Sequence, residues 1–330
     1  MPTADRIYWL HALTPLHVGA GKGEGYIDLP LMREKLTNYP FVPGSSVKGV
    51  FADSHGARDE IRNPKDIDDD GNEIENPQYS ALLHAAFGRA GDDTANAGAL
   101  VFTDAQLVCL PVRSLYGTFA WCTCPLVLQR LTRDLESAGL AESPAAPVTA
   151  VKQAESLIPD AESPESVLTS DVKIYLEDLD LSFRKSNVAT QWAGFLARQL
   201  FPADRNSSGA DWQQLFQQRF TILSDEVFSF LAETATEVQP HVRIEPDFKR
   251  VAKGALWYEE SLPAESILCG LVWCDPPRAH AKMRPAIEEL LKPQCVQMGG
   301  KATTGKGRVQ MRFSATTASG KVPTAGGINR

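Results

Sequence analysis

The stretch RIYWLHALTPLHVGAGKGEG spans residues 6–25 and sets the architecture of the chain. Its first part, residues 6–13, is rich in aromatic and β-branched side chains, which predicts a strand ended by the Thr14-Pro15 pair. Four glycines then occupy every second position from 19 to 25, and such a run fits neither a helix nor a strand interior. The sequence therefore predicts a sheet whose first strand leads directly into a glycine-rich loop.

Outward from this stretch, short strands and helices follow one another without the regular crossovers of a parallel sheet. Further strands are predicted over residues 26–34, 98–112 (one long strand or a pair), 173–183 and 266–274, with hairpins over 241–260 and 296–313. Helices are predicted within 41–54, 80–88, 124–139, 191–201, 225–235 and 277–291. Ser45 or Ser46 is the expected N-cap of the first helix, and Ser224 with Asp225 caps the fifth. The predicted class is α+β with an antiparallel sheet, in a single domain over residues 1–330.

The composition is that of an ordinary globular protein. Of the 330 residues, 43% are hydrophobic and 22% are charged, which excludes wholesale disorder and fibrous classes. No run of about 18 apolar residues and no N-terminal signal pattern occur, so we expect a cytoplasmic protein without a membrane segment. The six cysteines lack the spacing of a disulfide framework or a zinc knuckle and are expected in the core. Residues 314–330 are predicted to form a loose tail.

The net charge of −8 is unevenly distributed. Residues 59–76 carry a net charge of −6 and residues 135–167 carry −5, which leaves +3 on the rest of the chain. Both are predicted as solvated excursions, an acidic insertion over 55–97 and a proline-rich acidic loop over 135–170. Between 299 and 312 there are four basic residues and no acid, so the overall acidity does not exclude a nucleic-acid partner.

Three segments have the composition of a phosphate-binding backbone. The first is the loop with Gly19 and Gly21, whose missing side chains let backbone N–H groups approach a phosphate. The second is the helix start at Ser45, Ser46 and Lys48, where free N–H groups and the helix dipole attract an anion. The third joins small residues to cations between two strands: Gly299, Gly300, Lys301, Thr303, Thr304, Gly305, Lys306 and Arg308. Each segment also has an alternative interpretation without a bound phosphate. The first would be a flexible loop, the second an ordinary serine cap with an exposed lysine, and the third a hairpin without a ligand.

Titratable residues flank the glycine-rich loop. His17 and Asp28 could act as general acid and base beside a bound phosphate, or Asp28 could hold a metal ion; the alternative is an unrelated pair. Glu259 and Glu260 form a second carboxylate group after two aromatic residues, with a solvated strand end as the alternative. No nucleophile-elbow motif is present, so acyl-transfer chemistry finds no support.

Four blocks of the sequence together match one known family. They are HALTPLHVGAGKGEGYIDLPLMREKLTNYPFVPGSSVKGVF at 11–51, the block 98–131 that begins GALVFTDAQL, the block 223–263 that contains GALWYEE, and QMGGKATTGKGRVQMRF at 297–313. The chain resembles the RAMP-superfamily CRISPR proteins, and among these the repeated backbone subunit of type III-B (Cmr-type) effector complexes. The resemblance extends from about residue 7 to residue 313 and is interrupted by the two acidic segments.

The resemblance implies a right-hand-like subunit. It would have a modified ferredoxin-like (RRM-type) palm, helical fingers that include the 55–97 insertion, and a thumb formed by the hairpin 240–257. Copies of such a subunit stack in a filament along a CRISPR guide RNA, beside a large polymerase-like subunit, a small helical subunit and capping RAMP subunits. Each thumb displaces one nucleotide of the guide and of the complementary target RNA, and the target is cut there in a metal-dependent reaction.

The resemblance also assigns site residues. The family's catalytic Asp falls on Asp28, its functional His on His17, and its thumb-side Glu on Glu259, with Glu260 as the alternative. A weakly held divalent ion, Mg²⁺ or Mn²⁺, is implied at Asp28, which would act as its ligand or as a general base. Many relatives carry an aromatic residue where this chain has Ser261, so the roles around that corner differ. The thumb adds three RNA-binding cations: Arg243, Lys249 and Arg250.

Three functions are compatible with these residues. The first is a target-RNA endonuclease that is also the filament scaffold. The second is a guide-binding scaffold in which Asp28 is structural and another subunit cuts, and the third is a guide-processing nuclease that acts alone. The match to a backbone subunit argues against the third, and the position of Asp28 favours the first.

Overall fold

The computed structural model of the protein describes residues 6–21, 23, 25–56, 66–67, 73–74, 77–89, 96–140, 144, 150–161, 164–170, 173–203, 208–245, 249–275 and 282–314. Thirteen strands form one large sheet: β1 (Arg6–Ala12), β2 (Phe41–Val42), β7 (Leu100–Phe102), β8 (Ala105–Arg113), β9 (Phe119–Thr123), β10 (Glu155–Pro159), β11 (Thr169–Ser170), β12 (Lys173–Leu176), β13 (Leu179–Ser186), β14 (Phe220–Leu223), β17 (Ile267–Cys274), β18 (Gln294–Gln297) and β19 (Arg308–Phe313). Their order is β11-β12-β13-β10-β14-β9-β8-β17-β1-β19-β18, with β2 paired to β8 and β7 to β17. The sheet is mixed, because β10 pairs with β13, and β14 with β9, in parallel.

The first strand is buried on both faces, which explains its mostly apolar sequence. β1 lies between β17 and β19 and is antiparallel to both. Its residues from Ile7 to Ala12 are all buried, and alternate side chains enter two different core clusters. Tyr8 and Leu10 belong to one cluster, while Ile7 and Trp9 belong to the other.

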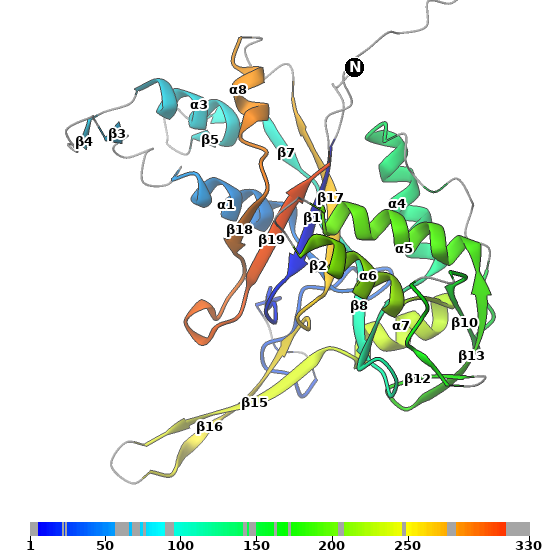
Figure 1. The fold of residues 1–330 in the computed structure, drawn as a ribbon. Coiled ribbons are helices and arrows are strands. Elements are labelled where there is room, and N and C mark those ends of the chain that lie inside the picture. The colour runs from blue at the N-terminus through cyan, green and yellow to red at the C-terminus, as the bar shows by residue number, and fades with distance from the viewer. Residues whose placement is uncertain are drawn as a thin grey trace, which may run out of the picture.

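Helices and further strands supply the rest of both clusters. α4 (Pro125–Ser137), α5 (Asn187–Leu200) and α6 (Gly209–Arg219) contribute to the cluster around Trp9. α1 (Gly44–Ser54), α3 (Pro77–Phe87), α7 (Asp225–Thr234) and α8 (Arg284–Glu289) contribute to the cluster around Tyr8. Figure 1 shows α4, α5 and α6 on one side of the sheet and α1, α3 and α8 on the other. The prediction of interleaved helices and strands with helices packed against one sheet is thereby confirmed, whereas the predicted antiparallel sheet is in fact mixed.

A long hairpin projects from this body (Figure 1). It consists of β15 (Glu237–Ile244) and β16 (Val251–Ser261), which are antiparallel in a register from Glu237↔Ser261 to Ile244↔Val251. The hairpin begins and ends several residues outside the predicted range 240–257, and the predicted turn at Pro246-Asp247 lies outside the described residues. Large apolar side chains are exposed along it: Val242, Ile244, Val251 and Leu256. We call this hairpin the thumb.

The predicted cap of the first helix is wrong. The N-cap of α1 is Pro43, and no side chain caps the helix. Instead, the Gly44 N–H donates to Asp104 Oδ1 at 2.7 Å, so a carboxylate distant in sequence takes the place predicted for Ser45 or Ser46. The cap predicted for α7 is confirmed, because Ser224 Oγ accepts a hydrogen bond from the Val227 N–H at 3.3 Å.

Four predicted segments differ from what the sequence pattern indicates. Residues 173–183 form the hairpin β12–β13, with Glu177 at a φ of +48° in the turn, because two short antiparallel strands have the same alternation as one long strand. The acidic segment 135–170 contains β10 in the interior of the sheet, where Leu157 and Ile158 are buried. Residues 26–34 make only isolated bridges instead of a strand. Within 277–291 the described helix is α8 alone.

The two remaining excursions are described only in part. Within 55–97 the structure has α3 and two small strand pairs, β3 (Asp66–Ile67) with β4 (Glu73–Ile74) and β5 (Gly88–Arg89) with β6 (Asn96–Ala97). At the C-terminus, Ser314 is buried and its Oγ accepts from the Ile7 N–H at 3.1 Å, so the first residue of the predicted tail belongs to the core. Residues 315–330 lie outside the described part.

Candidate functional site

One edge of β16 gathers the titratable residues that the sequence singles out. The Tyr258 N–H donates to Asp28 Oδ2 at 2.8 Å, and the Glu260 carbonyl accepts from His17 Nδ1 at 2.6 Å. Between these two bonds, Leu29 pairs with the same edge through its own backbone. Tyr258 and Glu260 are two residues apart on the strand, a rise of roughly 7 Å, so Asp28 and His17 are attached near each other at the root of the thumb.

The ring of His17 has one defined tautomer when neutral. A carbonyl oxygen can only accept, so Nδ1 carries the proton and Nε2 carries the lone pair. His17 is only 6% exposed, and its Nε2 faces Gly19, where a Cβ would lie 2.8 Å from that nitrogen. Gly299, at a φ of +76°, passes so close that a Cβ would lie 2.2 Å from the His17 carbonyl oxygen. The two glycines therefore let the chain close around the imidazole.

Asp28 is the exposed partner of the pair. Its Oδ2 is used by the Tyr258 N–H, and within the described residues no donor contacts Oδ1. Beside it, Tyr26 is 73% exposed and packs edge-on against Tyr258 with ring centroids 6.2 Å apart. Asp28 is therefore fixed by the backbone at one oxygen while the other oxygen can meet a ligand.

Glu260 has a structural role. It is 2% exposed, and its carboxylate accepts from the Leu31 N–H at 2.9 Å, from Thr236 Oγ1 at 2.8 Å and from the Arg33 guanidinium. These bonds join the segment after the glycine-rich loop to the root of the thumb. Because its donors occupy both oxygens, Glu260 is not directed toward a ligand.

Glu259 lies on the other face of the strand, between two lysines. It is 1% exposed, with Lys306 Nζ 2.8 Å from Oε1 and Lys301 Nζ 3.1 Å from Oε2. Burial acts to raise the pKa of Glu259, but the hydrogen bonds and charges of Lys306 and Lys301 outweigh it and lower the pKa below the ordinary value of 4.5. Lys306 also donates to Ser261 Oγ at 2.9 Å. The Glu259 carboxylate therefore stays ionised and is enclosed by ammonium groups.

The loop 299–308 closes over this pair. Lys306 is 6% exposed, so its ammonium group points inward, whereas Gly299, Gly300, Thr303, Thr304, Gly305 and Arg308 are exposed and Lys301 is partly exposed. The Gly300 N–H donates to the His17 carbonyl at 2.9 Å. The structure therefore brings together the first and third predicted phosphate-binding segments, together with His17, Asp28 and Glu259.

The other predicted RNA-binding residues lie apart from this edge. Ser45, Ser46 and Lys48 are in the first turn of α1, where Ser45 is exposed and the other two are partly exposed. Arg243, Lys249 and Arg250 are exposed along the thumb, and Arg250 Nε forms an ion pair with Glu245 at 2.8 Å. Both groups remain predictions.

Comparison with known proteins identifies the family. Residues 9–310 match the RAMP superfamily, which is most of the chain. The chain belongs to the RAMP superfamily. It is 30% identical over 318 residues to the CRISPR system Cmr endoribonuclease Cmr4 of Pyrococcus furiosus, covering 94% of this chain and 96% of that one. It is 24% identical to the CRISPR system CMR subunit Cmr4 of Saccharolobus solfataricus, covering 93% and 95%.

This RAMP protein has the same fold as solved structures of other proteins. An oligomeric Cmr4 from Pyrococcus furiosus aligns with a TM-score of 0.67 at 25% identity, covering 94% of this chain and 98% of that one. A chain of the type III-B Cmr-beta complex bound to cognate target RNA aligns with a TM-score of 0.66 at 20% identity, covering 94% and 98%. In the described part of the chain, no helix has the length and apolar character needed to cross a membrane.

The residues of the RAMP site could hold a metal ion only together with ligands from outside the protein, such as substrate phosphates and water. Among the described residues, no three His, Cys, Asp or Glu side chains are grouped as they would be in a protein-built metal site. Both oxygens of Glu259 are taken by lysines, which leaves Asp28 Oδ1 as the carboxylate oxygen at hand. Mg²⁺ is commonly held by one or two carboxylates together with substrate phosphates and water, so Asp28 can supply one ligand of such an ion.

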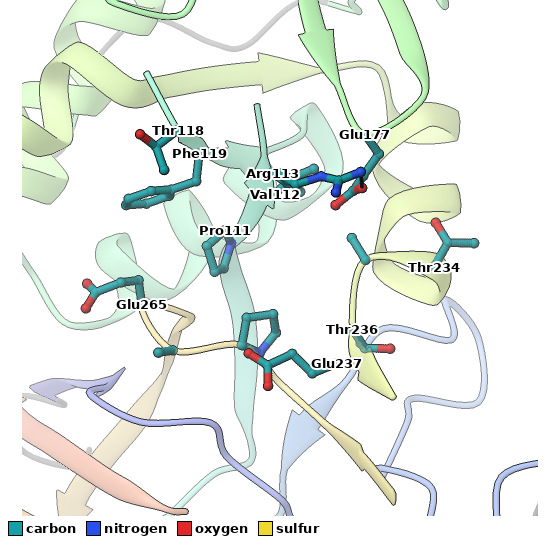
Figure 2. A pocket seen from close by; sticks show the side chains of 13 residues that line it. Pro111, Val112, Arg113, Thr118, Phe119, Glu177, Thr234, Thr236, Glu237 and Glu265 are labelled. Atoms are coloured by element: carbon teal, nitrogen blue, oxygen red, sulfur yellow. Dashed lines mark ion pairs between the residues drawn. The ribbon is translucent and has the colours of Figure 1, made fainter. Parts of the chain in front are cut away.

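A cavity of about 500 Å³ lies behind the thumb and contains none of the predicted site residues. Figure 2 shows Arg113 and Glu177 facing each other on one side of it and Glu265 on the other. Arg113 and Glu177 form an ion pair at 3.1 Å, and partial burial raises the pKa of Glu237 against the opposing charge of Lys306. The lining has three glutamates and one arginine, and this net negative charge disfavours a polyanion.

Sequence reasoning missed the groups that surround Glu259. His241 of β15 and Trp257 of β16 stack with ring centroids 5.7 Å apart, and His241 Nε2 lies 3.9 Å from Glu259 Oε2. Lys301 Nζ lies 5.9 Å from the centroid of the Trp257 ring. The alternation of Trp257, Glu259 and Ser261 on one face of a strand was the available signal, but the pairing with His241 depends on the hairpin register.

Proposed function

We propose that this protein is a guide-RNA-binding filament subunit of a type III-B CRISPR interference complex that cleaves complementary target RNA at regular intervals. The observation that carries the proposal is the attachment of His17 and Asp28 to one edge of β16, at the root of a projecting hairpin. The 30% identity to a protein named as a Cmr endoribonuclease supports the same activity. The likeness to an oligomeric relative and to a chain of a complex with target RNA supports filament formation and the other type III-B subunits as partners.

The chemistry needs no nucleophile from the protein. The 2′-hydroxyl of the nucleotide before the cleavage point loses its proton and attacks the phosphorus, the bond to the 5′-oxygen breaks, and that oxygen takes up a proton. The products are a 2′,3′-cyclic phosphate and a free 5′-hydroxyl. The step requires the two oxygens to be in line with the phosphorus, which a displaced nucleotide permits and a regular A-form duplex does not.

His17 and Asp28 have the atoms for the two proton transfers. Asp28 Oδ1 is an exposed carboxylate oxygen that can accept the 2′ proton, or can share in a metal ion that would polarise the phosphate. His17 Nε2 is the ring nitrogen that the Glu260 carbonyl does not bind; it faces Gly19, and in the imidazolium form it can donate to the leaving oxygen. Both are bound to backbone groups two residues apart on one strand, so one phosphodiester of the target can lie between them. A weakly held Mg²⁺ or Mn²⁺ is part of this proposal, with Asp28 as its one protein ligand.

We assign guide binding to protein surfaces that would contact the sugar–phosphate backbone of the RNA and not its bases. The exposed part of the loop 299–308, the glycine-rich loop with Gly19 and Gly21, the start of α1 with Lys48, and the thumb cations all offer N–H groups or positive charge. Base pairing between guide and target would then carry the sequence specificity. We further propose that the central strands of the large sheet correspond to the ferredoxin-like palm of the family, and that the protein works in the cytoplasm.

The decisive experiment uses Asp28→Asn in the assembled complex. The amide keeps an oxygen to accept from the Tyr258 N–H but loses the charge that a base or metal ligand needs. Guide binding, assembly and target binding should persist, while target cutting should fall by at least ~100-fold. Asp178→Asn, at an exposed turn between β12 and β13, is the matched control and should cut normally. Full cutting by an intact Asp28→Asn complex would leave only the non-catalytic, guide-binding scaffold.

A further inference from the structure

We propose that Lys301 is the cation that stabilises the charge developing on the scissile phosphate, and that Glu259 and Lys306 are positioning residues that hold it. This inference rests on the proposed RNA cleavage and deepens it, because it gives the thumb-side Glu259, whose function the resemblance leaves unspecified, a positioning role. It follows from three features of the loop 299–308: the enclosure of Glu259, the charge of the cluster, and the path of the chain past His17.

Glu259 is unsuited to touch RNA itself. Its side chain is almost fully buried, and each of its oxygens is held by a different ammonium group, at 2.8 Å and 3.1 Å. A general acid must hold a proton near neutral pH, and a carboxylate between two ammonium groups does not. A general base must present a lone pair to the substrate, and the lone pairs of Glu259 point toward Lys301 and Lys306.

Glu259, Lys301 and Lys306 together carry a net charge of one positive unit, which is available to a ligand. Lys306 is 6% exposed and neutralises Glu259 inside the protein, with Ser261 Oγ as its second acceptor at 2.9 Å. Lys301 adds a second positive charge to this neutral pair. Its side chain is 34% exposed, so the surplus charge lies at the surface. A buried counter-ion that fixes a partly exposed lysine is a way to present a cation without the loss of rotamer freedom on binding.

The path of the chain places this cation beside the reacting groups. Lys301 has a φ of +67° and follows Gly300, whose N–H is bonded to the His17 carbonyl. Its Nζ lies over Trp257 and against Glu259, the residues on either side of Tyr258, whose N–H holds Asp28. His17, Asp28 and the Lys301 ammonium group therefore converge on four consecutive residues of β16, from Trp257 to Glu260. A phosphate between His17 and Asp28 has Lys301 within reach of its non-bridging oxygens, where negative charge builds up during the attack.

The test measures single-turnover target cutting in complexes assembled with guide RNA. Lys301→Met removes the charge and is expected to slow cutting by roughly 100-fold, as removal of one charge-stabilising donor does. Lys301→Arg keeps the charge and should recover at least a tenth of the lost rate. Lys292→Met, an exposed cation outside the loop that pairs with Glu289, is the matched control and should cut normally.

A double-mutant cycle separates positioning from direct catalysis. Glu259→Gln should slow cutting, but the Lys301→Met/Glu259→Gln double variant should be no slower than Lys301→Met alone, because Glu259 acts through Lys301. Independent, multiplying losses would overturn the inference and return Glu259 to the reaction. If Glu259→Gln fails to fold, Glu259→Gln/Lys306→Met replaces the buried pair by neutral groups and completes the cycle.

Failure of this inference differs from failure of the proposed function. Normal cutting by Lys301→Met, with cutting abolished by Asp28→Asn, would reject Lys301 and leave the nuclease intact. Normal cutting by both variants would reject the nuclease itself. A loss of guide binding by Lys301→Met, measured as a weaker complex before any target is added, would return Lys301 to the guide-binding surface and also overturn the inference.

Discussion

His17 and Asp28 are bound to the same edge of β16 through the Glu260 carbonyl and the Tyr258 N–H. Neither residue is on β16, so their spacing is set by the backbone of the thumb and not by their own segment. Backbone groups of a strand have a fixed repeat, and side chains that are bonded to them inherit it. A site built in this way is defined before RNA arrives, and the same strand that sets the site continues into the thumb.

We expect Gly19→Ala to act on cutting through His17. A Cβ at this position would lie 2.8 Å from His17 Nε2, closer than real Cβ contacts, and the ring is held on its other side by the Glu260 carbonyl. The imidazole must therefore shift, and its Nε2 becomes covered. Single-turnover cutting should fall by roughly 10-fold to 100-fold, less than or at the lower end of what a general acid contributes, because the ring is displaced and not removed.

Guide binding separates this effect from damage to the loop. Gly19→Ala should bind guide RNA with nearly normal affinity. Gly194→Ala, inside α5, is the matched control and should gain stability by about 1 kcal/mol from helix propensity without a change in cutting. Equal losses of guide binding and cutting in Gly19→Ala would assign the glycine to RNA contact and not to His17.

The buried cluster at Glu259 predicts a pH dependence of stability. The groups that face this carboxylate are Lys306, Lys301 and His241. The pKa of Glu259 is lowered in the folded state, because the two lysines outweigh the burial that acts to raise it. A lowered pKa stabilises the fold above the unfolded pKa, and this contribution is lost as the pH falls through the folded pKa.

Glu259→Gln should therefore destabilise the protein at pH 7 and matter little in acid. Removing one partner of a buried pair costs about 3 kcal/mol, since Lys306 is left buried without its counter-ion. Urea unfolding at pH 7 and at pH 3 measures the difference. Glu226→Gln, in the first turn of α7, is the control, because Glu226 is exposed and outside this cluster. An equal loss at both pH values would mean that packing, and not charge, explains the effect.

Sequence reasoning succeeded where the signal is local. The apolar run 6–13, the Ser224 cap and the hairpin each have a short-range pattern, and each is present in the structure. It failed where the partner is distant. The sequence did not predict the strand β10, which lies in an acidic, proline-rich segment. Its burial between β13 and β14 depends on neighbours far along the chain.

The same distinction applies to the site. The glycines and cations of the loop 299–308 were found from their spacing, but the sequence treats Lys301, Lys306 and Arg308 as equivalent. The structure turns Lys306 inward to Glu259 and leaves Arg308 exposed. No local sequence pattern indicates whether a cation on a glycine-rich loop faces water or a buried carboxylate. The difference between Lys306 and Arg308 could therefore be seen only in the structure.

Arg308 is expected to contact the guide backbone. Its exposed guanidinium lies at the end of the loop, with Nε 3.4 Å from Cys295 Sγ. Arg308→Ala should weaken guide binding and lower the log–log salt slope by roughly 0.7, the value for one phosphate contact with a single strand. Lys292→Ala, an exposed cation beside α8, should leave the slope unchanged. A slope unaffected by Arg308→Ala would remove this end of the loop from the guide-binding surface.

The six cysteines predict a single accessible thiol. All are free, and five are buried, which confirms the expected core position for those five, while Cys295 is exposed. Burial raises the pKa of the Cys109 and Cys269 thiols well above the ordinary value of 9.0, which keeps them in the unreactive protonated form. A thiol reagent should therefore modify one cysteine quickly in the native protein and six in urea. Cys295→Ser should abolish the fast reaction; a fast phase that persists would place a second thiol at the surface.

The thumb carries apolar surface that contributes little to the isolated subunit. Val242 and Leu256 are cross-strand partners, and they are 44% and 53% exposed. Because an exposed side chain has little burial to lose, Val242→Ser/Leu256→Ser should change the free energy of unfolding by less than about 1 kcal/mol.

In the assembled complex the same pair is expected to pack against the displaced nucleotides, so target cutting should lose its regular spacing or fall by roughly 10-fold. Phe230→Ser on α7, which removes a side chain that is 52% exposed, is the matched control and should keep the spacing. Regular cutting by the thumb variant, resolved on a target with several cleavage points, would show that these side chains do not meet the RNA and that the hairpin acts through its backbone or its cations.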